Sequence, residues 1–253
     1  MNALVLLAAI LLLLMMLIGG KKGVRSFLAL FLNFSVVFIT VIFMNDPNRN
    51  PVVLTLLAAL VISCINLFYI NKINIKTKTA FVSTILSLLF LLFFILIMTD
   101  TAAIHGFSDE EIQELSMFSL YIGVDFARVA ASVIIMTTIG AITDTSIAIS
   151  SPMKEICDQN PHMNRKDLFL SGMSIGRDIL GTSTNTLFFA FFGGYLAMLI
   201  WFKDLPYSAG EFINSKVFSA EMITILSAGI GVTIVIPITS WITSYYLVRR
   251  KTR

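Results

Sequence analysis

Long apolar runs alternate with short polar segments along this chain of 253 residues. Each run is close to the ~20 residues that a helix needs to cross the ~30 Å hydrocarbon core of a bilayer. The seven runs are residues 2–18, 27–44, 51–70, 79–98, 118–145, 183–202 and 220–247. The pattern predicts an all-α, polytopic membrane helix bundle of about seven transmembrane helices, which forms one integral membrane domain over residues 1–253.

The basic residues predict the orientation of these helices. Lys and Arg close to helix ends stay on the cytoplasmic side during insertion. Basic clusters follow the first, third and seventh runs: Lys21, Lys22 and Arg25; Lys72, Lys76 and Lys78; Arg249, Arg250, Lys251 and Arg253. The connection after the fourth run is acidic, with Asp109, Glu110, Glu111 and Glu114. Seven crossings then place the N-terminus outside and the C-terminus inside, in the cell (plasma) membrane.

Composition narrows the class of protein. Hydrophobic residues make up 57% of the chain and charged residues 13%, so a soluble domain cannot hide this apolar surface. The net charge of +3 is spread over short loop clusters, which argues against nucleic-acid binding. His105, His162, Cys64 and Cys157 show no metal-ligand spacing, and no nucleophile, base and orienting group share a recognisable spacing. We therefore expect no metal, no cofactor and no enzymatic activity.

The fifth run carries the first candidate for a polar site. Asp125 and Arg128 are three residues apart, so they lie on one helical face and can pair. The pair has two interpretations: it fixes the helix near the headgroups, or it lines a polar pathway that binds an anion, a cation or a proton. Small residues on a separate stripe of the same helix predict that it is central to the bundle.

The helical pattern of the fifth run continues past residue 145 and is too long for one straight crossing. The helix is expected to tilt, to break near Gly140, or to protrude into the cytoplasm. Asp144 then lies near the inner face of the membrane. It is interpreted either as a solvated interfacial aspartate or as part of the polar site.

A glycine-rich segment precedes the sixth run. Gly172, Gly176 and Gly181 interrupt an apolar background, Arg177 and Asp178 are adjacent, and Thr182 or Ser183 is a candidate N-cap for a helix. Free amides at such a helix start bind anions. Residues 168–182 are expected to form either a re-entrant segment or an interfacial amphipathic linker, with Gly140, Gly172, Gly176 and Gly181 supplying backbone flexibility. The candidate polar residues for a substrate or an ion are Asp144, Arg177, Asp178, Thr182, Thr184, Asn185, Asp125 and Arg128.

Two sequence blocks resemble the YibE/F-like family of bacterial integral membrane proteins. They are GAITDTSIAISSPMKEI from Gly140 to Ile156 and SGMSIGRDILGTSTNTLFFAFFGG from Ser171 to Gly194. Without an extended extracellular part, the chain looks like the shorter, YibF-type member. The resemblance implies a hetero-oligomer with a longer YibE-like membrane partner, but no assigned activity.

The sequence and the resemblance together support two functions. The first is a permease-like or transport-related subunit for an unknown small solute or ion. In it, Asp144 and Asp178 handle a cation or proton, while Arg177 and the amides of the sixth helix hold an anionic group. The alternative is a non-transporting accessory or assembly subunit, whose polar motif binds the YibE-like partner.

Overall fold

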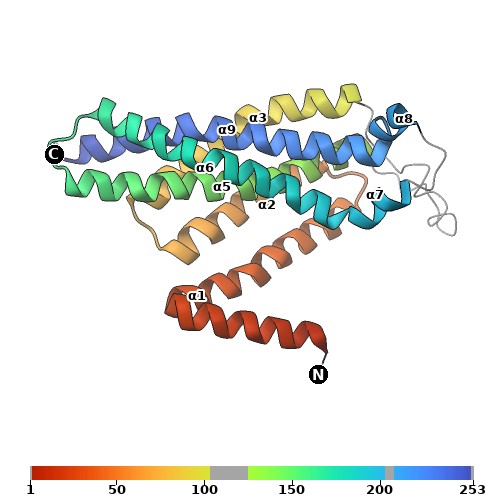
Figure 1. Ribbon diagram of the computed structural model, residues 1–253, viewed down its shortest axis with the longest axis horizontal. Helices are drawn as coiled ribbons and strands as arrows, with labels where there is room; N and C mark the ends of the chain where they lie inside the picture. Colours follow the sequence, from red (N-terminus) through yellow and green to blue (C-terminus); the bar gives the residue numbers. More distant parts are fainter. Residues whose placement is uncertain (1, 103–124, 203–207, 252–253) are drawn as a thin grey trace.

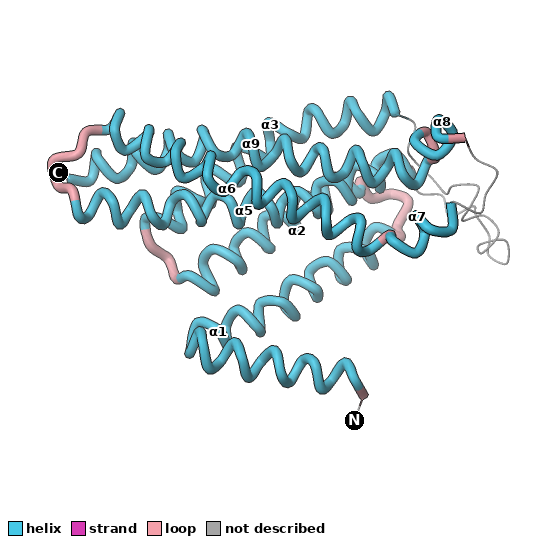
Figure 2. The backbone as a smooth tube through the Cα atoms, in the orientation of Figure 1, coloured by secondary structure: helices cyan, strands magenta, loops and turns pink. Residues whose placement is uncertain are grey.

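The chain is an elongated bundle of helices (Figure 1), in a computed structural model that describes residues 2–102, 125–202 and 208–251. The helices are α1 (Ala3–Met44), α2 (Pro51–Cys64), the π-helical turn η1 (Ile65–Tyr69), α3 (Ile75–Ala102), α5 (Phe126–Gln159), α6 (Arg165–Gly194), α7 (Leu196–Phe202), α8 (Ala209–Ile213) and α9 (Lys216–Lys251). No strand occurs among the described residues (Figure 2). The prediction of an all-α fold is confirmed.

The core of the bundle lies between α3, α5 and α9, which pack on one another. Its buried side chains include Leu91 and Ile95 from α3, Ile135 and Ile139 from α5, and Val235 from α9. Helix α5 also contacts α2 and α6, so its central position in the bundle is as expected.

Five helical segments are long and apolar enough to cross a membrane: Ala3–Met44, Pro51–Tyr69, Ile75–Thr99, Phe126–Gln159 and Lys216–Arg249. The difference from the seven expected crossings has two causes. Helix α1 contains the first two apolar runs, and α6 carries charged residues along its first half and is not among the five. Seven passes and the N-out orientation stay predictions.

The backbone of Gly20 explains how the single element α1 contains the first two apolar runs. Gly20 has a φ of 53° and a ψ of −136°, a conformation open to glycine but strained for residues with a side chain. The helix reverses there into two arms (Figure 1). Behind the corner, a Cβ on Gly23 would lie 1.7 Å from the carbonyl oxygen of Met15, so the arms touch through their backbones.

Helices α5 and α6 differ from the expected boundaries. Helix α5 runs without a break through Gly140 and Pro152 to Gln159, so the predicted break near Gly140 is wrong, whereas a tilt and a protrusion into the cytoplasm stay predictions. Residues 118–124 of the predicted fifth helix lie outside the described residues.

Helix α6 begins at Arg165, where the side chain of Asn164 accepts a hydrogen bond from the amide of Asp167. The predicted cap at Thr182 or Ser183 is therefore wrong, because these residues lie inside a continuous helix whose amides bond to the preceding turn. Residues 168–182 are helical, and whether they lie at the interface or re-enter the membrane stays a prediction. The predicted run 183–202 is divided at Tyr195 into the end of α6 and the short α7.

The basic segments gather at one end of the bundle. The corner of α1, the connection from η1 to α3 and the C-terminal end of α9 lie toward the left in Figure 1, together with the charge-balanced connection from α5 to α6. The connection from α1 to α2 lies at the opposite end. We call the end at which the basic segments lie the basic end. Its composition agrees with the alternation of loop charge along the sequence.

Candidate functional site

Helix α6 packs on α9 through Gly172 and Gly176, the first two glycines of its glycine-rich segment. A Cβ on Gly172 would lie 2.7 Å from the hydroxyl oxygen of Ser240, and a Cβ on Gly176 would lie 2.2 Å from a methyl carbon of Ile236. Glycines four residues apart allow two helix backbones to approach closely. The structure therefore gives this Gly-x-x-x-Gly pair a packing role, whereas their contribution to backbone bending stays a prediction.

The other two motif glycines lie in open surroundings. A Cβ on Gly181 or on Gly140 would meet no atom within 4 Å. Helices α5 and α6 continue through these positions without a non-helical residue. Neither glycine is needed for a close contact with another described residue.

Thr184 is turned toward α9. A Cβ on Gly229 would lie 3.8 Å from the methyl carbon of Thr184, and the Thr184 hydroxyl donates to the carbonyl of Leu180 at 2.8 Å. Among the predicted site residues of α6, Thr184 thus belongs to the packed face.

The remaining candidates of α6 share its outer face. Arg177, Asp178, Thr182 and Asn185 are exposed, and at 100° per residue they fall within one side of the helix. The Thr182 hydroxyl donates to the carbonyl of Ile179 at 2.9 Å. In the described part of the chain, the side chains of Arg177, Asp178 and Asn185 have no hydrogen bond or ion pair. We call these four residues the α6 polar face.

Aromatic residues indicate the depth of the α6 polar face. Trp241 and Tyr245 of α9 are exposed near the basic end, and the guanidinium of Arg165 lies 5.5 Å and 4.9 Å from their ring centres. Exposed Trp and Tyr beside Arg are typical of the boundary between headgroups and hydrocarbon. Tyr246 adds a third exposed ring at this level.

The contacts between α6 and α9 give the position of the α6 polar face relative to these aromatic rings. Gly176 contacts Ile236, which is about 8 Å along α9 from Trp241 at ~1.5 Å per residue. Thr184 contacts Gly229, about 18 Å from Trp241 on the same scale. Along α9, the α6 polar face therefore lies on the side of Trp241 away from the basic end, and its depth in a membrane stays a prediction.

Asp144 of α5 is also exposed and has no ion pair among the described residues. The structure does not join it to the α6 residues in a shared cavity. Two cavities of about 580 Å³ and 370 Å³ in the described part of the chain are lined by none of the predicted site residues. In the described part of the chain, Arg177, Asp178, Thr182 and Asn185 thus lie on an outer surface, and neither of these two cavities includes them.

Asp125 and Arg128 form the expected ion pair, with 3.0 Å between a carboxylate oxygen of Asp125 and Nε of Arg128. Asp125 is also the N-cap of α5, because its carboxylate accepts hydrogen bonds from the amides of Ala127 and Arg128. Both side chains are about half exposed, at 49% and 53%. The geometry favours the structural interpretation of this pair.

Two polar features escaped the sequence analysis. Glu221 of α9 accepts a hydrogen bond of 2.8 Å from the hydroxyl of Tyr195, at the division between α6 and α7. The sequence did contain a signal for this contact, because Glu221 is a carboxylate inside the apolar run 220–247. Buried hydroxyls also join α3 to α5, with 3.0 Å between the hydroxyl oxygens of Thr84 and Ser146.

Comparison with known proteins identifies a family. A family model described as "YibE/F-like protein" matches residues 7–249, nearly the whole chain. No curated protein and no solved structure matches the chain.

Proposed function

Because the chain belongs to the YibE/F-like family, we propose that it is a transport-related subunit of a membrane complex, whose α6 polar face lies against a second membrane chain. The observation that carries the proposal is the exposure of Arg177, Asp178 and Asn185 on the face of α6 that is turned away from its packed glycines. At the membrane depth that we infer from the exposed aromatic residues of α9, these groups face lipid in a monomer.

Lipid is a poor surrounding for such a surface. A charged side chain near the middle of a bilayer costs ~3 kcal/mol on insertion scales, and residues of this kind normally face other helices or a water-filled space. The long side chain of Arg177 can bend toward the headgroups, but the short side chains of Asp178 and Asn185 cannot. A partner helix with polar groups or bound water satisfies them.

The partner that fits is another member of the same family, the longer YibE-like chain that the sequence resemblance implies. In the resulting interface, Arg177 holds an anionic group of the solute, and Asp178 takes up a cation or a proton. Asp144 of α5 is the second acidic group available to this pathway. The solute remains unnamed, because neither the side chains nor the family supplies one.

The accessory or assembly subunit is the second candidate function. The two cavities described above favour it, because none of the predicted site residues lines either cavity. In this alternative the same polar face binds the partner and conducts nothing.

One variant separates the two functions. Asp178→Asn keeps the size and removes the charge, and the protein is co-expressed with its YibE-like neighbour, purified, and reconstituted into vesicles for uptake of candidate ions and solutes. An intact complex with lost uptake supports transport, whereas a lost complex supports the assembly function. Lys166→Gln, at the exposed start of α6, is the matched control and leaves both properties unchanged.

The double variant Arg177→Leu/Asp178→Leu tests the polar face itself. We expect it to fold as a monomer and to fail to recover the partner. Full recovery of the partner together with unchanged uptake would contradict both functions.

A further inference from the structure

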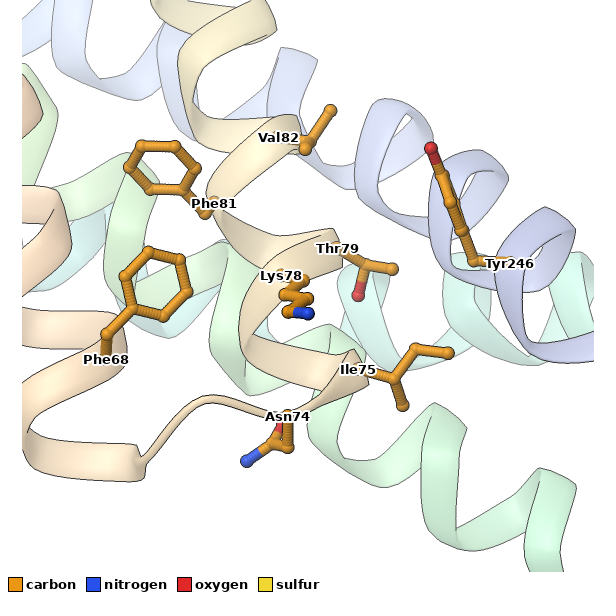
Figure 3. Close-up of a pocket in the computed structure, with 8 residues that line it drawn as sticks. All are labelled: Phe68, Asn74, Ile75, Lys78, Thr79, Phe81, Val82 and Tyr246. Atoms are coloured by element: carbon orange, nitrogen blue, oxygen red, sulfur yellow. The ribbon is translucent and has the colours of Figure 1, made fainter. Parts of the chain in front are cut away.

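A cavity of about 580 Å³ lies between η1, the start of α3 and the last turns of α9 (Figure 3). Its volume is within the range of ordinary ligand sites, ~300–1,000 Å³. The aromatic rings of Phe68 and Phe81 lie on one side and Tyr246 on the other, with Lys78 between them (Figure 3). The cavity is separate from the α6 polar face.

We propose that this cavity binds an anionic phospholipid, with the phosphate on Lys78 and one acyl chain along the outer stripe of α3. The first argument is charge. Lys78 is exposed and has no acidic partner among the described residues, whereas the neighbouring Lys76 already donates to the hydroxyl of Ser151 at 3.0 Å. Lys78 is thus the ammonium group at the cavity that is free for a phosphate.

The second argument is the apolar path that leaves the cavity. Val82 lines it one helical turn beyond Lys78, and Leu86, Leu89 and Phe93 continue the same stripe of α3 at helical spacing. All four side chains are exposed, from 40% for Val82 to 73% for Phe93. A cation at one end and an exposed apolar stripe at the other match the two parts of a phospholipid.

The third argument is position. Tyr246 belongs to the exposed aromatic residues at the basic end, the level at which headgroups meet hydrocarbon. Tyr246 lines the cavity on the side opposite Phe68 and Phe81 (Figure 3). The rings of Phe68 and Phe81, with centres 5.1 Å apart, form the apolar wall of the cavity across from Tyr246. The cytoplasmic leaflet, which the orientation predicted from loop charge places here, is rich in anionic lipids.

The test is native mass spectrometry of the purified full chain with added phosphatidylglycerol or phosphatidylcholine. The wild-type protein is expected to prefer phosphatidylglycerol. Lys78→Gln is expected to lower its affinity about fivefold, the effect of one basic residue near an anionic lipid surface, without a change for phosphatidylcholine. Lys166→Gln removes an exposed lysine of the same end that does not line the cavity and leaves both affinities unchanged.

Val82→Trp fills the cavity without a change in charge and is expected to weaken binding of phosphatidylglycerol. Excess inorganic phosphate distinguishes a lipid from a free anion. Displacement of phosphatidylglycerol by phosphate, or equal phosphate binding by Val82→Trp and the wild type, would show a phosphate site instead. Equal affinity of Lys78→Gln and the wild type for phosphatidylglycerol would overturn the proposal.

Discussion

The glycines of α6 differ in what surrounds them, although they occur in one short motif. Gly176 faces α9 with no room for a methyl group, whereas Gly181 faces outward into open space. An added methyl group is therefore expected to have opposite effects on stability at these two positions.

Alanine at each position measures this difference. Gly176→Ala is expected to destabilise the protein by ~1–3 kcal/mol, because the new methyl group overlaps Ile236. Gly181→Ala is expected to stabilise α6 by up to ~1 kcal/mol through its helix propensity. Thermal unfolding of both variants in the same detergent checks the signs. Equal shifts would contradict the packing of α6 on α9.

At the scale of the element, the corner in α1 is the most unusual backbone feature. It brings the two arms into contact at Gly23 and Met15, directly beside Lys21 and Lys22. The first arm has no buried residue before this corner. The corner, and not packing on the bundle, therefore holds the first arm in place.

Gly23→Ala is expected to open the corner, because its methyl group would lie 1.7 Å from the carbonyl oxygen of Met15 and a backbone atom must move. Spin labels at the exposed positions Leu7 and Leu32, one on each arm, are expected to report a longer distance in this variant. Gly19→Ala is the control, since its Cβ would meet nothing within 4 Å. Identical distance distributions in all three proteins would count against the corner.

At the scale of the whole molecule, the bundle has one basic end and an opposite end with little positive charge in its short connections. This asymmetry predicts orientation as well as the level of the lipid cavity. The connection from α1 to α2 is expected outside, and the connection from α5 to α6 inside.

Single-cysteine labelling checks the orientation. With Cys64 and Cys157 replaced by serine, Asn48→Cys is expected to react with a membrane-impermeant maleimide in intact cells. His162→Cys is expected to react only after the cells are permeabilised. The reverse pattern would invert the topology and place the lipid cavity in the outer leaflet.

The sequence by itself determined the features that depend on composition and local spacing. Apolar runs of bilayer length predicted a helical membrane protein, and two motif blocks predicted the family that the comparison confirms. The ion pair of Asp125 with Arg128 was predicted for the same reason, since i,i+3 neighbours meet on any helix. Each of these inferences needs only the geometry of one segment.

Tertiary structure decided which face of a helix is used and where a helix begins. Gly172 and Gly176 pack on α9 while Arg177 and Asp178 face outward, although the four residues lie within seven positions of sequence. The start of α6 at Arg165 likewise could not be separated from a start near Thr182, because polar residues and glycines signal a helix end in both places. Contacts with other helices choose between such alternatives, and those contacts come from residues distant in the chain.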